Sequence, residues 1–97
     1  MWPEVRDIVL ADRRLLTNYQ LEIETRFPDE TAVAYRKFVE NLLSSASNRG
    51  VYREAAGYLV RMQKLGHGEE GRALARFYIE KYPQRRAMIE EFKRATS

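Results

Sequence analysis

Apolar residues recur at intervals of three and four along most of the chain, the spacing that places them on one face of a helix. Tyr35, Phe38, Val39 and Leu42 illustrate the pattern within one stretch. No segment alternates apolar and polar residues with an enrichment of β-branched side chains, so the sequence predicts no strand. The pattern predicts five helices, over residues 3–25, 28–46, 50–65, 69–82 and 83–95.

Prolines and glycines mark the ends of these helices. Pro28 and Pro83 each suit the first turn of a helix, where a missing N–H costs nothing, and each disfavours helical geometry in the residue before it. Gly66 and Gly68 flank His67 and form the clearest break, because glycine readily adopts left-handed backbone. The connections are short, so we expect consecutive helices to pack antiparallel.

These signals predict an all-α fold, an antiparallel bundle of about five helices. The 97 residues suffice for one domain with a modest core, and we treat residues 1–97 as a single helical domain, which is either complete or a piece of a longer protein. The expected core is Ile8, Leu15, Leu16, Tyr19, Ile23, Phe38, Leu42, Ala55, Ala56, Leu59, Leu74, Phe77, Ile89 and Phe92.

An internal echo gives the bundle the character of a helical-hairpin repeat. Residues 23–28 read Ile-Glu-Thr-Arg-Phe-Pro, and residues 79–83 read Ile-Glu-Lys-Tyr-Pro. Such echoes are typical of solenoid-like, tetratricopeptide-like stacks, although no strict 34-residue tetratricopeptide period runs through the chain. The alternative is that both segments are simply a good helix end followed by a good helix start.

Composition narrows the classes of function. The chain has no cysteine and only one histidine, which argues against disulfides, thiolate metal sites and cysteine nucleophiles, so we predict no metal or other cofactor. No apolar run is long enough to cross a bilayer, and the first residues lack the features of a secretory signal. We therefore expect a cytoplasmic protein that does not bind membranes.

Candidate catalytic groups are sparse. A catalytic histidine needs an orienting partner, and near His67 the sequence offers only Glu69 and Glu70, so we interpret His67 as a solvent-exposed turn residue. The two adjacent glutamates point about 100° apart on a helix and are better explained as favourable charge at a helix start. The sequence thus predicts that the chain is not an enzyme.

Basic residues concentrate on the last two predicted helices. The net charge is +3, from 17 lysines and arginines against 14 acids, and the pI is near 9.4. A stripe of cations there could contact phosphates, with Phe77, Tyr78 or Tyr82 as stacking partners for bases. The alternative is that these cations merely solvate the outer face and offset helix dipoles. The candidate anion-binding residues are Arg72, Arg76, Arg85, Arg86, Lys93 and Arg94.

The second half of the chain resembles a known family. The runs Tyr-Arg-Glu-Ala-Ala-Gly-Tyr-Leu at 52–59, Gly-Arg-Ala-Leu at 71–74 and Lys-Tyr-Pro-Gln-Arg-Arg-Ala-Met-Ile-Glu-Glu-Phe at 81–92 resemble the helical region that follows the zinc finger in SWIM-type zinc finger proteins. The resemblance implies a helical appendage involved in DNA or protein binding. The defining cysteines and histidine of that family have no counterpart here, so its metal site is carried over to no residue.

Together these features predict a non-catalytic helical scaffold or protein–protein interaction module. We expect its partner to be another protein, a peptide or a second copy of the chain. The alternative is an accessory nucleic-acid-binding domain that uses the basic stripe on the last two helices.

Overall fold

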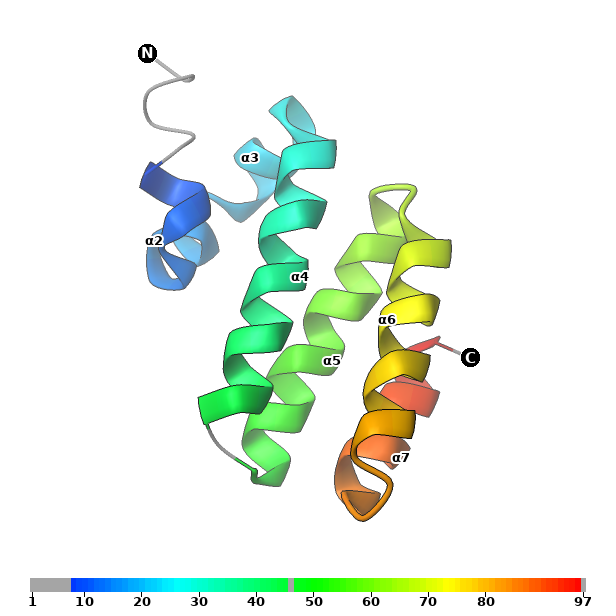
Figure 1. Ribbon diagram of the computed structural model, residues 1–97. Coiled ribbons are helices and arrows are strands. Elements are labelled where there is room, and N and C mark those ends of the chain that lie inside the picture. Colours follow the sequence, from blue (N-terminus) through cyan, green and yellow to red (C-terminus); the bar gives the residue numbers. More distant parts are fainter. Residues whose placement is uncertain (1–7, 46, 97) are drawn as a thin grey trace.

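The computed structural model describes residues 8–45 and 47–96, and all regular structure in these ranges is helical (Figure 1). The prediction of an all-α fold is therefore confirmed. The predicted helix start at Pro3 lies outside the described residues. Residues 8–11 are helical, and the labelled helices are α2 (Arg13–Asn18), α3 (Gln20–Arg26), α4 (Pro28–Ser45), α5 (Arg49–Lys64), α6 (Gly68–Lys81) and α7 (Arg86–Thr96).

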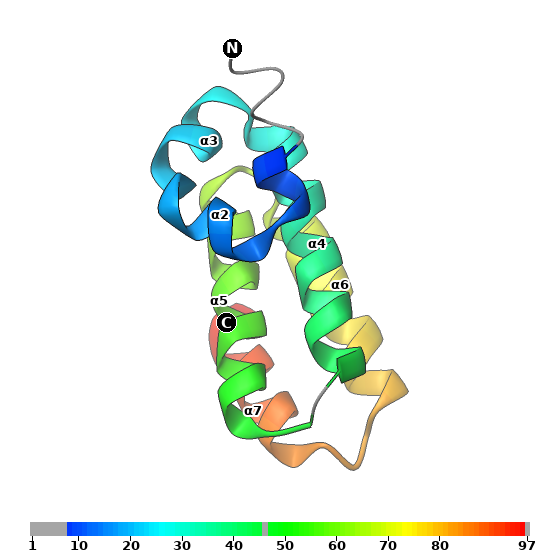
Figure 2. The same ribbon diagram turned by 90° about the vertical axis from the view of Figure 1, so that its left-hand side faces the viewer.

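The four longest helices form two stacked antiparallel hairpins, α4–α5 and α6–α7. Figures 1 and 2 show α4 and α6 in one layer and α5 and α7 in the other, with α5 contacting all three of the other helices. Because both hairpins run the same way, α4 and α6 are parallel neighbours whose N-terminal ends lie at the same end of the molecule. The short helices α2 and α3 lie on the side of α4 that is away from α6.

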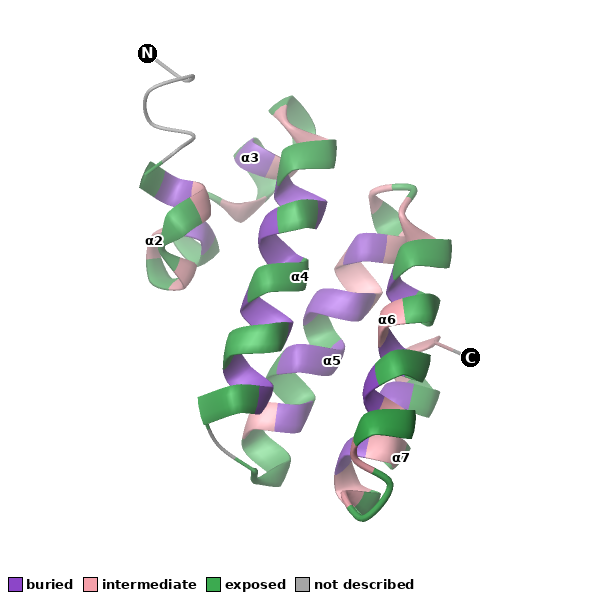
Figure 3. Ribbon diagram, viewed as in Figure 1, coloured by how far each residue is buried: buried purple, intermediate pink, exposed green. Residues whose placement is uncertain are grey.

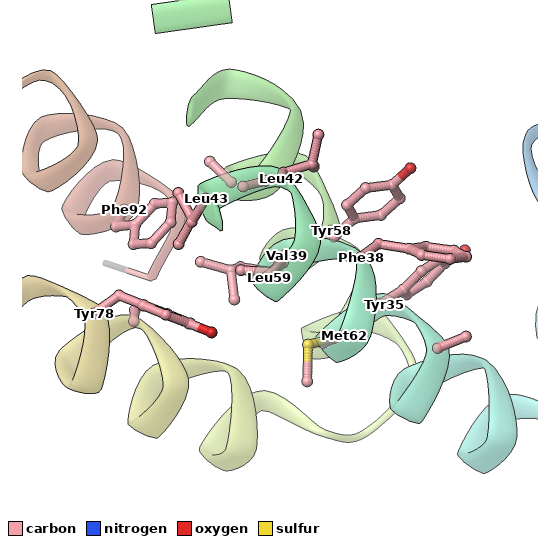
Figure 4. Packing of buried hydrophobic residues seen from close by; sticks show 14 of the residues in the cluster. Tyr35, Phe38, Val39, Leu42, Leu43, Tyr58, Leu59, Met62, Tyr78 and Phe92 are labelled. Carbon is pink, nitrogen blue, oxygen red and sulfur yellow. The ribbon is translucent and has the colours of Figure 1, made fainter. Parts of the chain in front are cut away.

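The core fills the space between the two layers (Figure 4). The Tyr35 and Tyr58 rings stack with centroids 5.0 Å apart, and the Phe38 ring lies 5.6 Å from that of Tyr58. Where α5 meets α6, the buried Gly71 faces Leu59 and Met62 of α5. The further side chains that are fully buried include Leu16, Ile23, Val39, Leu43, Met62, Met88 and Phe92.

Three residues of the predicted core are in fact exposed, namely Ile8 (62%), Tyr19 (44%) and Phe77 (55%). Figure 3 shows that exposed and buried residues alternate along the helices, so that each helix has an outer and an inner face. Leu15, Leu74 and Ile89 are only partly buried at the edge of the core. The rest of the predicted core is buried. Phe77 is exposed because α6 buries the stripe through Gly71, Ala75 and Tyr78 against its neighbours, and position 77 is turned away from it.

The single predicted helix over residues 3–25 is wrong, because the chain breaks at Asp12 and again at Tyr19. Asp12 has extended backbone, and its carboxylate accepts hydrogen bonds from the N–H groups of Arg14 (2.9 Å) and Leu15 (3.4 Å) as the N-cap of α2. Leu16 of α2 and Ile23 of α3 are both fully buried, so the short helices on either side of the break at Tyr19 each contribute a side chain to the core.

The last helix begins at Arg86, three residues after the predicted start at Pro83. Pro83 instead occupies the second position of a turn that the Arg85 N–H closes onto the Tyr82 carbonyl at 3.1 Å. The echo between residues 23–28 and 79–83 therefore ends at the proline. Up to that point the backbone repeats, since Phe27 (φ −135°, ψ 64°) and Tyr82 (φ −126°, ψ 66°) end α3 and α6 in the same conformation.

The predicted break after α5 is confirmed. Gly66 has a φ of +84°, and the N–H groups of Gly66 and His67 donate to the carbonyls of Gln63 (3.1 Å) and Met62 (2.9 Å). This pair of bonds is the Schellman arrangement, which satisfies the last carbonyls of a helix. It directs the chain back along α5 and places His67 at the start of α6.

Two carboxylates tie the helices together, that of Glu24, which is partly buried, and that of Glu91, which is buried. Arg61 of α5 donates two hydrogen bonds to Glu24 of α3 (2.8 and 3.2 Å), and the hydroxyl of Tyr35 donates a third at 2.6 Å. At the other end of the molecule Glu91 of α7 is buried and pairs with Arg49 of α5 at 3.0 Å. Each carboxylate thus carries the charged partner that a buried acid requires.

Candidate functional site

A partly apolar depression lies between α4 and α6. It is an open hollow of about 380 Å³ that we call the α4–α6 groove. The two helices that flank it, α4 and α6, stand side by side in Figure 1. Its lining residues are Arg36 and Glu40 of α4 together with Glu70, Ala73, Leu74, Phe77 and Tyr78 of α6.

Contacts between the two hairpins lie beyond both ends of the groove. At the N-terminal end, His67 Nε2 lies 2.8 Å from the Asp29 carboxylate, which joins the start of α6 to the first turn of α4. At the opposite end, the Arg85 guanidinium donates to the Leu43 carbonyl at 3.2 Å, in the last turn of α4. These two contacts join the hairpins near the two ends of α4, and the groove lies along the stretch between the contacts.

Aromatic rings form the α6 wall of the groove. The Phe77 ring packs edge-on against the Tyr78 ring at 5.2 Å, and the Tyr78 ring lies parallel to the Tyr82 ring at 6.2 Å. Tyr78 is buried, which raises the pKa of its hydroxyl, with the charge of Glu40 adding to the effect. Of this aromatic row, Phe77 presents the largest exposed surface to a ligand.

The opposite wall offers charge of both signs. Arg36 and Glu40 lie one helical turn apart on α4, and both are exposed. Neither forms an ion pair with another residue in the part of the chain that the structure describes. A ligand in the groove would therefore meet an apolar aromatic wall on one side and two available charges on the other.

The groove contains few groups that could take part in acid–base chemistry. Its only described hydroxyl belongs to Tyr78, which is a weak acid in its buried setting, and Glu70 is already engaged by His67. Within residues 8–45 and 47–96, no three histidine, aspartate or glutamate side chains lie close enough together to hold a metal ion. Nor does any helix in these ranges have the length and apolar character needed to cross a membrane.

A larger hollow of about 500 Å³ lies on the opposite face of α4, against residues 11–14. Polar side chains dominate its lining, namely those of Asp12, Arg13, Arg14 and Asn41. The Asp12 carboxylate already caps α2, and Arg13 pairs with Glu54 at 3.2 Å. Its one aromatic residue, Phe38, is buried, so this hollow has no exposed apolar anchor.

The six cations proposed from the sequence do not form one continuous stripe. Arg72 and Arg76 are exposed one turn apart on α6, whereas Arg85 and Arg86 lie at the turn that leads into α7. Lys93 and Arg94 are exposed in the last turn of α7, towards its other end, where Arg94 lies 3.9 Å from Glu91.

Arg85 has a structural task that the sequence did not reveal. Besides capping α4, its guanidinium lies 3.9 Å above the Tyr82 ring. These two contacts explain why a cation stands just before α7, where the helix dipole disfavours it. Tyr78 and Tyr82 are correspondingly poor stacking platforms, because Tyr78 is buried and Arg85 covers Tyr82.

The prediction that His67 is a solvent-exposed turn residue is wrong. Its side chain is only 19% exposed, and its second ring nitrogen, Nδ1, lies 3.1 Å from Glu70. The two carboxylates raise the pKa of the imidazole, the hydrogen bond to Asp29 more than that to Glu70. Sequence reasoning found the neighbour Glu70 but missed Asp29, because only the stacking of the hairpins brings position 29 to position 67.

Comparisons of the chain with protein-family models, with curated proteins and with solved structures find no match. The resemblance to SWIM-type zinc finger proteins thus stays a prediction from the residues that suggested it.

Proposed function

We propose that the chain is a non-catalytic protein-interaction module that binds a short segment of a partner protein in the α4–α6 groove. The observation that carries the proposal is the position of Phe77, a large apolar side chain that is 55% exposed in the wall of the α4–α6 groove. Exposed aromatic residues beside a depression are typical anchors for protein partners.

The groove also suggests what the segment should look like. An apolar side chain of the ligand would pack against Leu74 and Phe77, and a base and an acid would face Glu40 and Arg36. From Glu70 to Phe77 the α6 wall extends for about 10 Å at 1.5 Å per residue, which matches about two turns of a ligand helix. A short amphipathic segment with one apolar anchor and charges of both signs therefore fits best.

A peptide library displayed on phage tests the proposal. Selection against the domain should enrich peptides with such an anchor, and Phe77→Glu should weaken their binding about tenfold or more, as expected for an interface anchor. Leu21→Glu is the matched control, because Leu21 is also apolar and 74% exposed but lies on α3, away from the groove. Enriched peptides that bind the Phe77→Glu domain undiminished would contradict the proposal, as would a selection without enrichment.

Sedimentation equilibrium distinguishes a segment of another protein from a segment of a second copy of this chain. If the groove takes a second copy, the wild-type domain should self-associate and Phe77→Glu should be monomeric, with Leu21→Glu unchanged. A monomeric wild-type domain that binds selected peptides assigns the groove to another protein.

A second candidate function is nucleic-acid binding, which one feature of α6 favours. The Lys81 ammonium lies 5.7 Å from the centroid of the Phe77 ring, so an exposed aromatic face and a cation stand side by side. Arg76 is exposed on the same helix. Stacked bases and their phosphates are recognised by this combination.

Fluorescence anisotropy of labelled duplex and single-stranded DNA, at two salt concentrations, tests this candidate. Binding that weakens steeply with salt and is reduced by Arg76→Ala supports it. Unchanged anisotropy at both salt concentrations rejects it and leaves protein binding as the proposed function.

A further inference from the structure

Both ring nitrogens of His67 face carboxylate oxygens from different helices. Nε2 lies 2.8 Å from Asp29 of α4, and Nδ1 lies 3.1 Å from Glu70 of α6. A carboxylate oxygen only accepts hydrogen bonds, so both contacts require both ring nitrogens to donate, which only the protonated imidazolium does. The neutral ring has one acceptor nitrogen and keeps at most one of these bonds.

The position of the ring makes this protonation consequential. The contact with Asp29 is the tie between the first turns of α4 and α6, and thus between the two hairpins at that end of the groove. Two helix N-termini carry partial positive charge and oppose both each other and a cation between them. The negative charges of Asp29 and Glu70 offset this electrostatic repulsion.

Other charges also stand close to the ring and must be weighed. The charged groups carried by the helix ends that meet there are Asp29 and Glu30 of α4, Lys64 of α5, and Glu69, Glu70 and Arg72 of α6. Of the four acids, only Asp29 and Glu70 pair with His67. The imidazolium is therefore favoured, and its pKa stands above the ordinary value of 6.5.

We propose that His67 is a protonation-dependent latch that joins the N-terminal ends of α4 and α6 and sets the width of the α4–α6 groove at that end. Loss of the proton removes one of the two bonds. When the remaining proton is on Nδ1, the bond to Asp29 is the one that is lost, which frees α4 to separate from α6 there. The effect of the latch on ligand binding rests on the function proposed above, whereas the latch itself does not.

The sign of its effect on stability follows from linkage. Because the folded-state pKa is raised, the latch stabilises the fold fully below about pH 6.5, the pKa of an unperturbed histidine, and this stabilisation is lost as the pH rises through the folded-state pKa. The melting temperature of the wild-type domain relative to that of His67→Gln should therefore increase as the pH falls from about 8 to about 5.5, a range in which carboxylates are ordinarily ionised.

The direct test is an NMR titration of the imidazole in domain labelled with ¹³C and carrying no polyhistidine tag. His67 is the only histidine, so a single ring signal reports its pKa. We expect a wild-type pKa above 6.5. Asp29→Asn should lower it clearly, and Glu30→Gln, which removes the neighbouring acid of the same helix turn, should lower it less.

Amide signals in the first turns of α4 and α6 should shift with the same midpoint in the wild-type domain, and this coupling should disappear in Asp29→Asn. A wild-type pKa at or below 6.5, or one that Asp29→Asn leaves unchanged, would overturn the latch. Because no ligand is present, this result is independent of whether the groove binds a peptide.

Discussion

Leu59 and Phe77 were expected from the sequence to lie together in the core, and the structure separates their energetic roles. Leu59 of α5 is 0% exposed and lies among Val39, Leu43 and Met62 (Figure 4), whereas Phe77 of α6 is 55% exposed. Replacing each by alanine in turn should therefore give very different losses of stability.

The magnitudes follow from burial. Truncating a fully buried leucine to alanine removes its transfer free energy and leaves a cavity, and it costs about 2–5 kcal/mol, for which we expect about 3 kcal/mol here. Full burial of a phenylalanine side chain stabilises a fold by about 1.5–3 kcal/mol, and Phe77→Ala should lose less than half of this because the side chain is mostly exposed. The higher helix propensity of alanine offsets about 0.5 kcal/mol of that loss. The net cost of Phe77→Ala should stay below about 1 kcal/mol.

Thermal unfolding followed by far-ultraviolet circular dichroism measures both changes. A loss of about 3 kcal/mol lowers the melting temperature of a domain of this size by about 12–24 °C, and Phe77→Ala should lower it by less than about 8 °C. Equal losses for the two variants would refute the assigned register of α6. A small loss for Phe77→Ala, by contrast, leaves its side chain available for a partner.

Two further pairs of variants test local features of the fold by the same melting assay. Gly57 lies exposed within α5 with open space around it, so Gly57→Ala should stabilise the domain by about 0.5–1 kcal/mol. Gly66→Ala should instead destabilise it by about 1 kcal/mol or more, because Gly66 holds a φ of +84°. Equal changes at both glycines would contradict the Schellman ending of α5. Arg85→Ala should cost about 1 kcal/mol through the lost cap on α4, and Arg86→Ala, at an exposed position, should be close to neutral. A neutral Arg85→Ala would show that the contact with Leu43 adds nothing to stability.

Local signals in the sequence were sufficient for most of the fold. The start of α4 at Pro28 and the end of α5 before Gly66 depend on backbone restrictions that act within a few residues. The continuous helical spacing of residues 3–25 was misleading, because apolar periodicity alone does not register the backbone breaks at Asp12 and Tyr19.

The candidate site was harder to predict for the same reason. The groove combines Arg36 and Glu40 with side chains some forty residues later, and no local pattern marks them as neighbours. The only local hint was Phe77, which was assigned to the core because helical spacing does not separate the buried stripe of α6 from the position beside it. The partnership of His67 with Asp29 likewise exists only once the hairpins have stacked.

The measurement that tests the proposed function most directly is an NMR titration of ¹⁵N-labelled domain with the best peptide from the phage selection. We expect chemical-shift changes for the amides on the facing sides of α4 and α6, around Arg36, Glu40, Leu74 and Phe77. Signals that move instead on α2 and α3 or on the outer side of α7, with the groove residues unaffected, would contradict it.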